Sequence, residues 1–147
     1  MGSLLVMREN MRTRRYLGAC LDVEFAKTEM VRMIEMISNH TIRIDSNEDI
    51  RMEMEFVRML EIRWNQGLNI AKQRRDTVNT LMYEMVRFDE TRPHLATVHT
   101  WFSPFRDILR EHIVLADRAV VSLRQLERRV NQALAEKRLA EVLAGFG

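Results

Sequence analysis

The strongest constraint on the fold is a long apolar pattern in the middle of the chain. Its spacing alternates between four and three residues over eleven consecutive positions, nine of them apolar: Ile50, Met54, Val57, Glu61, Trp64, Leu68, Ala71, Arg75, Val78, Met82 and Met85. This spacing keeps the side chains on one face of an α-helix and is typical of long helices that pack side by side. A half-buried strand would need alternation with a period of two. The pattern therefore predicts one long helix over about residues 46–89.

Two flanking segments carry the same kind of pattern. The earlier one contains Tyr16, Cys20, Val23, Lys27, Met30, Ile34 and Ile37, and the later one contains Leu109, Ile113, Ala116, Val120, Leu123, Leu126, Val130 and Leu134. Polar breaks separate the segments, and Pro93 disfavours helical conformation in the residue before it. We therefore predict helices over about 4–38, 46–89 and 104–143. They form a single all-α domain over residues 1–147, an elongated antiparallel three-helix bundle or coiled coil with a short helical turn in the second connection.

Composition excludes several other classes of protein. Five Gly and two Pro among 147 residues are too few for a barrel or sandwich of many short strands. The single cysteine, Cys20, allows neither an internal disulfide nor a thiolate zinc site. No stretch approaches the ~18 uninterrupted apolar residues of a membrane span, and no signal-peptide pattern is present. We therefore expect a chain without a transmembrane segment in an intracellular compartment, cytoplasmic or nuclear.

The sequence contains little that suits catalysis. It lacks the glycine-rich phosphate loop and the nucleophile elbow of common enzyme families. Its four histidines do not have the spacing of metal ligands on a helical face: His40, His94, His99 and His112. Apolar neighbours predict that His112 is packed. We therefore predict no enzymatic activity, no catalytic residue, no metal site and no cofactor.

Charged residues interrupt the apolar seams at three positions, Lys27, Glu61 and Arg75. Short connections force neighbouring helices to run antiparallel. Reflection about a first turn near residue 43 places Lys27 level with Glu61. Reflection about the second connection places Arg75 opposite Asp117. We predict that these two charge pairs fix the register between the helices, as buried polar positions do in coiled coils.

Surplus apolar residues point to a partner. The aromatic residues of the second connection either cap the bundle end or stay exposed as anchors for another molecule. The long helices also carry more apolar positions than one stripe per helix requires. The predicted partner contacts are Trp101, Phe102, Phe105, Met52, Phe56 and Met59. We therefore predict a non-enzymatic interaction or scaffolding module that homo-oligomerises or docks another helical protein.

The arginine excess supports an alternative function. Arginine accounts for 20 of the 23 basic residues, and its planar guanidinium group suits phosphate binding. Seven arginines are predicted to gather toward one end of the rod: Arg8, Arg12, Arg14, Arg15, Arg74, Arg75 and Arg118. The alternative is therefore nucleic-acid binding, to RNA rather than to a specific DNA sequence, with an anionic membrane surface as a third choice. The net charge of only +2 and the interleaved acidic residues count against both.

Overall fold

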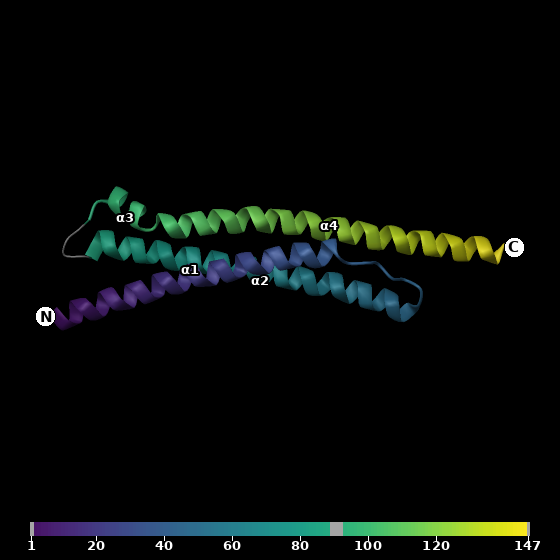
Figure 1. The fold of residues 1–147 in the computed structure, drawn as a ribbon, viewed down its shortest axis with the longest axis horizontal. Helices are drawn as coiled ribbons and strands as arrows, with labels where there is room; N and C mark the ends of the chain where they lie inside the picture. Colours follow the sequence, from purple (N-terminus) through teal and green to yellow (C-terminus); the bar gives the residue numbers. More distant parts are fainter. Residues whose placement is uncertain (1, 89–92, 147) are drawn as a thin grey trace.

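The computed structural model describes residues 2–88 and 93–146, with side chains for residues 11–87 and 93–146. Three long helices form an elongated rod: α1 (Gly2–Ser38), α2 (Asn47–Phe88) and α4 (Ser103–Gly145). The short helix α3 (Leu95–Trp101) lies in the second connection. The helices alternate in direction, so α1 and α4 run parallel and α2 runs against both (Figure 1). The all-α fold, the three-helix architecture and the short helix are all as predicted, and the described residues contain no strand.

Helix α2 starts where the sequence provides a cap. The Ser46 hydroxyl oxygen accepts a hydrogen bond from the Asp49 backbone N–H at 3.1 Å, which satisfies one of the free N–H groups of the first turn. Glu48 and Asp49 place negative charge at this end, where the helix dipole stabilises it. Pro104 lies in the first turn of α4, where its missing N–H costs no hydrogen bond.

The buried seams follow the predicted four-three spacing, but half of each seam is shifted by one residue. In α1 the buried side chains are Ala19, Val23, Ala26, Met30, Met33 and Ile37. In α4 they are Phe105, His112, Ala116, Ala119, Leu123, Leu126 and Val130. In α2, Leu60 and Leu81 are buried one position before the predicted Glu61 and Met82. The shift moves the charged residues Lys27, Glu61 and Arg75 from the seam to its edge, where Lys27 is partly exposed and Glu61 and Arg75 are exposed.

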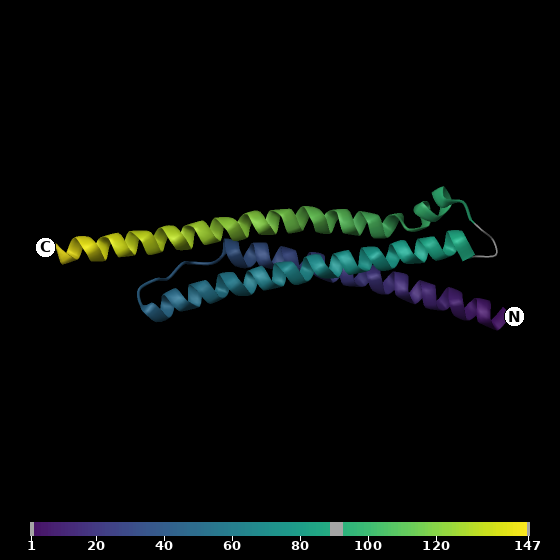
Figure 2. The same ribbon diagram turned by 180° about the vertical axis from the view of Figure 1, so that it is seen from behind.

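The first connection corrects the register between α1 and α2. It continues past the end of α1 without helical structure before α2 begins (Figure 2). An extended chain rises ~3.3 Å per residue against ~1.5 Å in a helix, so the first turns of α2 lie beside this connection instead of beside α1. Gly67 consequently lies against Met30, because a Cβ at Gly67 would be 2.6 Å from the Met30 Cε. Lys27 is therefore about two and a half turns from Glu61, and the predicted pairing is wrong.

A similar offset separates Arg75 from Asp117. Trp64 donates a hydrogen bond from Nε1 to the Ala116 carbonyl oxygen at 2.9 Å, which sets the level of α2 against α4. Arg75 is three helical turns further along α2, so it lies near the start of α4 and not beside Asp117. The reason is that α3 packs beside the last turns of α2, and α4 begins only after it (Figure 1).

Candidate interaction surface

The second connection divides its aromatic side chains between the core and solvent. Phe102 and Phe105 are buried in one cluster with Val98 of α3. Tyr16 packs edge-on against Phe102 with ring centroids 4.8 Å apart, and its hydroxyl accepts a hydrogen bond from the Phe105 N–H at 3.3 Å. Trp101 remains 50% exposed. Phe102 and Phe105 thus close this end of the bundle and are not the predicted exposed contacts for a partner, while Trp101 stays accessible to a partner.

The same cluster encloses Cys20. Burial is the main cause that raises the pKa of the Tyr16 hydroxyl to about 12, with the nearby Cys20 sulfur adding to it. Burial also raises the pKa of the Cys20 thiol. A thiol kept protonated is a poor nucleophile, so Cys20 acts here as a packed, half-buried side chain.

The three predicted contacts on α2 differ in accessibility. Met52 is exposed, whereas Phe56 and Met59 pack against the core cluster around Leu60. Phe56 also stacks on the His40 ring of the first connection, with centroids 4.4 Å apart. The extended connection covers this part of α2, so only Met52 of the three presents most of its side chain to solvent.

A buried carboxylate holds the first connection in place. Glu53 is buried on α2, and its Oε2 lies 2.6 Å from the His40 Nε2. The Arg43 backbone N–H donates to the other oxygen at 2.9 Å. From α4, the Lys137 Nζ donates to the Ile44 carbonyl oxygen at 2.6 Å. Sequence reasoning missed this site, although Glu53 occupies a heptad position seven residues before the buried Leu60.

The charged residues at the seam edges find other partners. The Lys27 Nζ lies 2.6 Å from the Glu111 Oε2 on α4 and 3.2 Å from Glu24, and the hydrogen bond to Glu111 is the main cause that raises the Lys27 pKa. Glu61 forms a hydrogen bond with Glu127 of α4, and this contact with a second carboxyl group raises the Glu127 pKa. Of the two carboxylates that pair with Lys27, Glu24 thus lies on α1 and Glu111 on α4, which runs parallel to α1.

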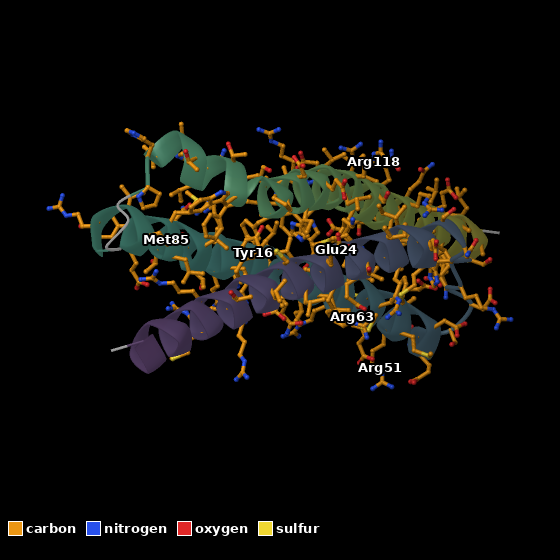
Figure 3. The ribbon with its side chains drawn as sticks, turned by 60° about the vertical axis from the view of Figure 1, so that its left-hand side comes forward. Tyr16, Glu24, Arg51, Arg63, Met85 and Arg118 are labelled. Carbon is orange, nitrogen blue, oxygen red and sulfur yellow. The ribbon has the colours of Figure 1, made fainter. Side chains whose placement is uncertain are left out.

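The structure does not bring the seven arginines together. The Arg74 Nε lies 2.5 Å from the Asp22 Oδ2, and the Arg15 Nη1 lies 4.0 Å from the Glu84 Oε2. Arg118 is on α4, displaced along the rod from Tyr16 of α1, the sequence neighbour of Arg15 (Figure 3).

Distance along the rod also separates Arg118 from the start of α1. The contact between Lys27 and Glu111 places Arg118 about 25 Å or more beyond Arg15. Arg12 and Arg14 lie on α1 near Arg15, Arg75 lies 3.6 Å from Asp76, and the Arg8 side chain is outside the described residues. The predicted single cluster of guanidinium groups is therefore wrong where it includes Arg118.

His112 lies in the centre of the bundle with no polar partner. It is 1% exposed, and neither ring nitrogen has a hydrogen bond within the described part of the chain. Its Nε2 lies 3.9 Å from the position of a Cβ at Gly67. Burial lowers the pKa of its imidazole. The expectation that His112 is packed is confirmed.

The outer face of α1 and the groove between α1 and α2 expose large apolar side chains. Leu21 is 69% exposed and Phe25 61% exposed, with Leu17 beside them. Phe25 also lines a groove of about 360 Å³, and Met36 and Ile70 line its other walls. Residues Glu29, Arg32, Arg63 and Gln66 form the polar rim of this groove. An apolar floor with a charged rim resembles a protein–protein interface more than an enzyme pocket.

A second exposed apolar stripe lies at the end of α4. This part of the helix extends beyond the start of α2 (Figure 1). Its apolar residues recur at positions i, i+3, i+4 and i+7, all of them exposed: Leu139, Val142, Leu143 and Phe146. This is the spacing of an amphipathic helix face, and none of the helices in the described residues covers it.

These features define an all-α bundle whose recognisable surfaces are apolar helix faces. Across residues 11–87 and 93–146, no group of three or more His, Cys, Asp or Glu side chains is placed to hold a metal ion. None of the helices, over the residues described, is both long and apolar enough to cross a bilayer. Comparisons with known protein families, with curated proteins and with solved structures give no match.

Proposed function

We propose that this chain is a non-enzymatic protein–protein interaction or scaffolding module, which homo-oligomerises or docks a partner helix. The observation that carries the proposal is the exposure of large apolar side chains outside a core that is already closed. Leu17, Leu21 and Phe25 follow one another along α1 at intervals of four residues, so they form a continuous stripe. Contiguous apolar patches of this kind mark interaction sites.

The shape of the surface favours a helical partner. The groove beside Phe25 runs between α1 and α2, and its rim carries acidic and basic groups such as Glu29 and Arg63. A third helix laid into such a groove buries its apolar face on Phe25, Met36 and Ile70 while its polar face stays in water. Rim charges then select the partner and its direction.

The arginines give less support to the alternative of nucleic-acid binding. Arg74 and Arg15 face carboxylates of their own chain, and Arg118 is far from both along the rod. A phosphate backbone would have to compete with Asp22 and Glu84 for these groups. Binding of RNA or anionic membranes is therefore not the function we put forward.

The proposal is tested by measuring the mass of the chain in solution and its affinity for helical peptides. We expect light scattering at micromolar concentration to give more than the 17.5 kDa monomer, or a displayed library of amphipathic helices to yield a binder. Phe25→Ser with Met36→Ser weakens either interaction, whereas Val121→Ser on the exposed side of α4 leaves it unchanged. A strict monomer that binds no helix in the library refutes the proposal.

A further inference from the structure

The outer face of α1 carries a second four-three pattern that the bundle does not use. Gly18, Leu21 and Phe25 follow this spacing, with Arg14 four residues before Gly18 and Thr28 three residues after Phe25. Arg14, Leu21, Phe25 and Thr28 are exposed. The stripe is continuous on one side of the helix, while the residues that α1 buries in the bundle lie elsewhere on its circumference. It is therefore available to another molecule.

Gly18 has no role inside the bundle. A Cβ at this position would meet nothing within 4 Å, so the fold leaves room for a side chain. Glycine inside a helix weakens it relative to alanine, but it allows another backbone or a large group to approach closely. Nothing among the described residues approaches Gly18. The hollow above it faces outward, next to Leu17, Leu21 and Phe25.

We propose that α1 packs antiparallel against α1 of a second copy of this chain, with the two-fold axis between Leu21 and Asp22. This inference rests on the proposed function and names the partner. In this pairing the Phe25 ring of each copy lies over Gly18 of the other, and the symmetry repeats the contact. Leu21 of the two copies meet beside the axis.

Charge agrees with the same alignment. Arg14 of one copy comes level with Glu29 of the other, and the symmetry makes this pair twice. Glu29 already lies 2.8 Å from Arg32, and a second guanidinium group fits its other oxygen. Asp22 lies beside the axis, and its charge is neutralised within each copy by Arg74 at 2.5 Å. The two Asp22 carboxylates beside the two-fold axis therefore each have a counter-charge.

The same alignment also places a side chain of the second copy at the groove between α1 and α2. Met11 is exposed on α1, and in the antiparallel alignment Met11 of the second copy comes level with Arg32. It therefore lies at the groove that Phe25 and Met36 line. The same face of α1 thus supplies the Phe25 ring, the space above Gly18, the two charges of Arg14 and Glu29, and the Met11 side chain for the groove. A second copy matches every part of it, which an unrelated helix would do only by coincidence.

Disulfide trapping tests the position of the axis. In a Cys20→Ser background, Leu21→Cys places two thiols beside the two-fold axis, within the Cα separation of ~7 Å that a disulfide tolerates. We expect mild oxidation to convert most of this variant into a covalent dimer. Met36→Cys on the same helix and Val121→Cys on α4 are controls at positions that are also exposed, though less than Leu21, and they are expected to remain monomers. Equal or greater cross-linking at either control overturns the proposed alignment.

Association measurements test the contacts. We expect Gly18→Leu to weaken dimerisation at least tenfold while circular dichroism shows an unchanged or higher helix content, because the bundle has space for the new side chain. Arg14→Glu and Glu29→Arg each weaken it several-fold, and the double variant recovers it. Arg128→Glu, an exposed arginine on α4, is the control and has no effect.

The outcomes separate this inference from the proposed function. A wild-type monomer that binds a helical peptide overturns the pairing of α1 and leaves the interaction module standing. An oligomer that ignores Gly18→Leu, or a double charge variant that fails to recover, also overturns the pairing alone. Only a monomer with no helical partner removes both.

Discussion

Replacing His112 with leucine tests the most unusual residue of the core. The imidazole is 1% exposed and occupies a heptad position of α4, with its Nε2 near Gly67 of α2, beside which the Met30 side chain also lies. Both ring nitrogens lack a hydrogen-bond partner among the described residues. A buried polar atom without a partner costs about 1–3 kcal/mol. Leucine has a similar volume and no polar atom.

We therefore expect His112→Leu to stabilise the bundle. Imperfect shape matching offsets part of the gain, so the free energy of unfolding at pH 8 should rise by about 1–2 kcal/mol. For a domain of this size, that corresponds to roughly 3–6 °C in Tm.

Acid should enlarge the difference between the two proteins. Burial lowers the pKa of His112 below its ordinary value of 6.5, so the unfolded chain binds a proton more readily than the folded chain. Stability from this group is fully present above about pH 6.5 and is lost as the pH falls toward the folded pKa. Within that window each pH unit removes about 1.4 kcal/mol. The leucine variant lacks this loss.

Urea unfolding followed by far-UV circular dichroism, at one protein concentration and several pH values, measures both effects. His94→Leu is the matched control, because His94 is exposed at the start of α3. Its pH dependence should match that of the wild type. The reasoning is refuted if His112→Leu is no more stable than the wild type at pH 8, or if its stability falls just as steeply below pH 6.5.

Four further substitutions probe other parts of the structure. Glu53→Ala leaves His40 and the Arg43 N–H without their partner, so we expect a loss of about 1–3 kcal/mol in urea unfolding; a loss as small as that of Glu55→Ala, an exposed neighbour, would contradict this. In a solution dilute enough to keep the chain monomeric, Gly18→Ala should raise stability by about 0.5–1 kcal/mol, and Gly67→Ala should gain less because Met30 has to move; an equal gain at both positions would show that Met30 yields freely. The carboxyl group of Glu61 raises the pKa of Glu127, so this pair weakens the fold as the pH rises from about 4.5 past the folded pKa. Glu127→Gln should therefore gain a few tenths of a kcal/mol at neutral pH and nothing at pH 4, and a gain that is the same at both values argues against the carboxyl contact.

Sequence periodicity predicted the helices correctly, because the four-three spacing is a local property of each segment, and the short connections predicted their alternating directions. It did not give the exact face. Val23, Met30 and Ile37 are buried as predicted, but Ala19 and Met33 are buried in place of Cys20 and Ile34. A helix with two neighbours buries a wide stripe, and several apolar residues at its edges make adjacent choices look alike.

The register between neighbouring helices could not be predicted from the sequence, for a different reason. Reflection about a turn assumes that both helices end at the same level. The first connection instead continues in extended form and is held there by Glu53, and α3 occupies the side of α2 at the other end. Lys27 consequently meets Glu111, which no reflection between consecutive helices could suggest, since α1 and α4 are not consecutive.

The candidate surface was only partly foreseeable. Surplus apolar residues on the helices predicted exposed faces, and Trp101 and Met52 are indeed exposed. Which of the aromatic residues would close the bundle depended on contacts with Tyr16, far away in the sequence. The proposed contact at Gly18 could not be predicted from the periodicity, because it depends on the open space around this residue in the structure.

The staggered ends of the helices set how the rod loosens. All three long helices overlap from the cluster around Ala19, Val78 and Phe105 to the cluster around Met30, Leu60 and Leu126, and residues 138–146 of α4, beyond this overlap, are all exposed. Backbone amides in the middle should therefore exchange with deuterium most slowly, at a rate governed by global unfolding. Protection should decline step by step toward both tips, so the last turns of α4 can open and re-form many times while the centre stays closed.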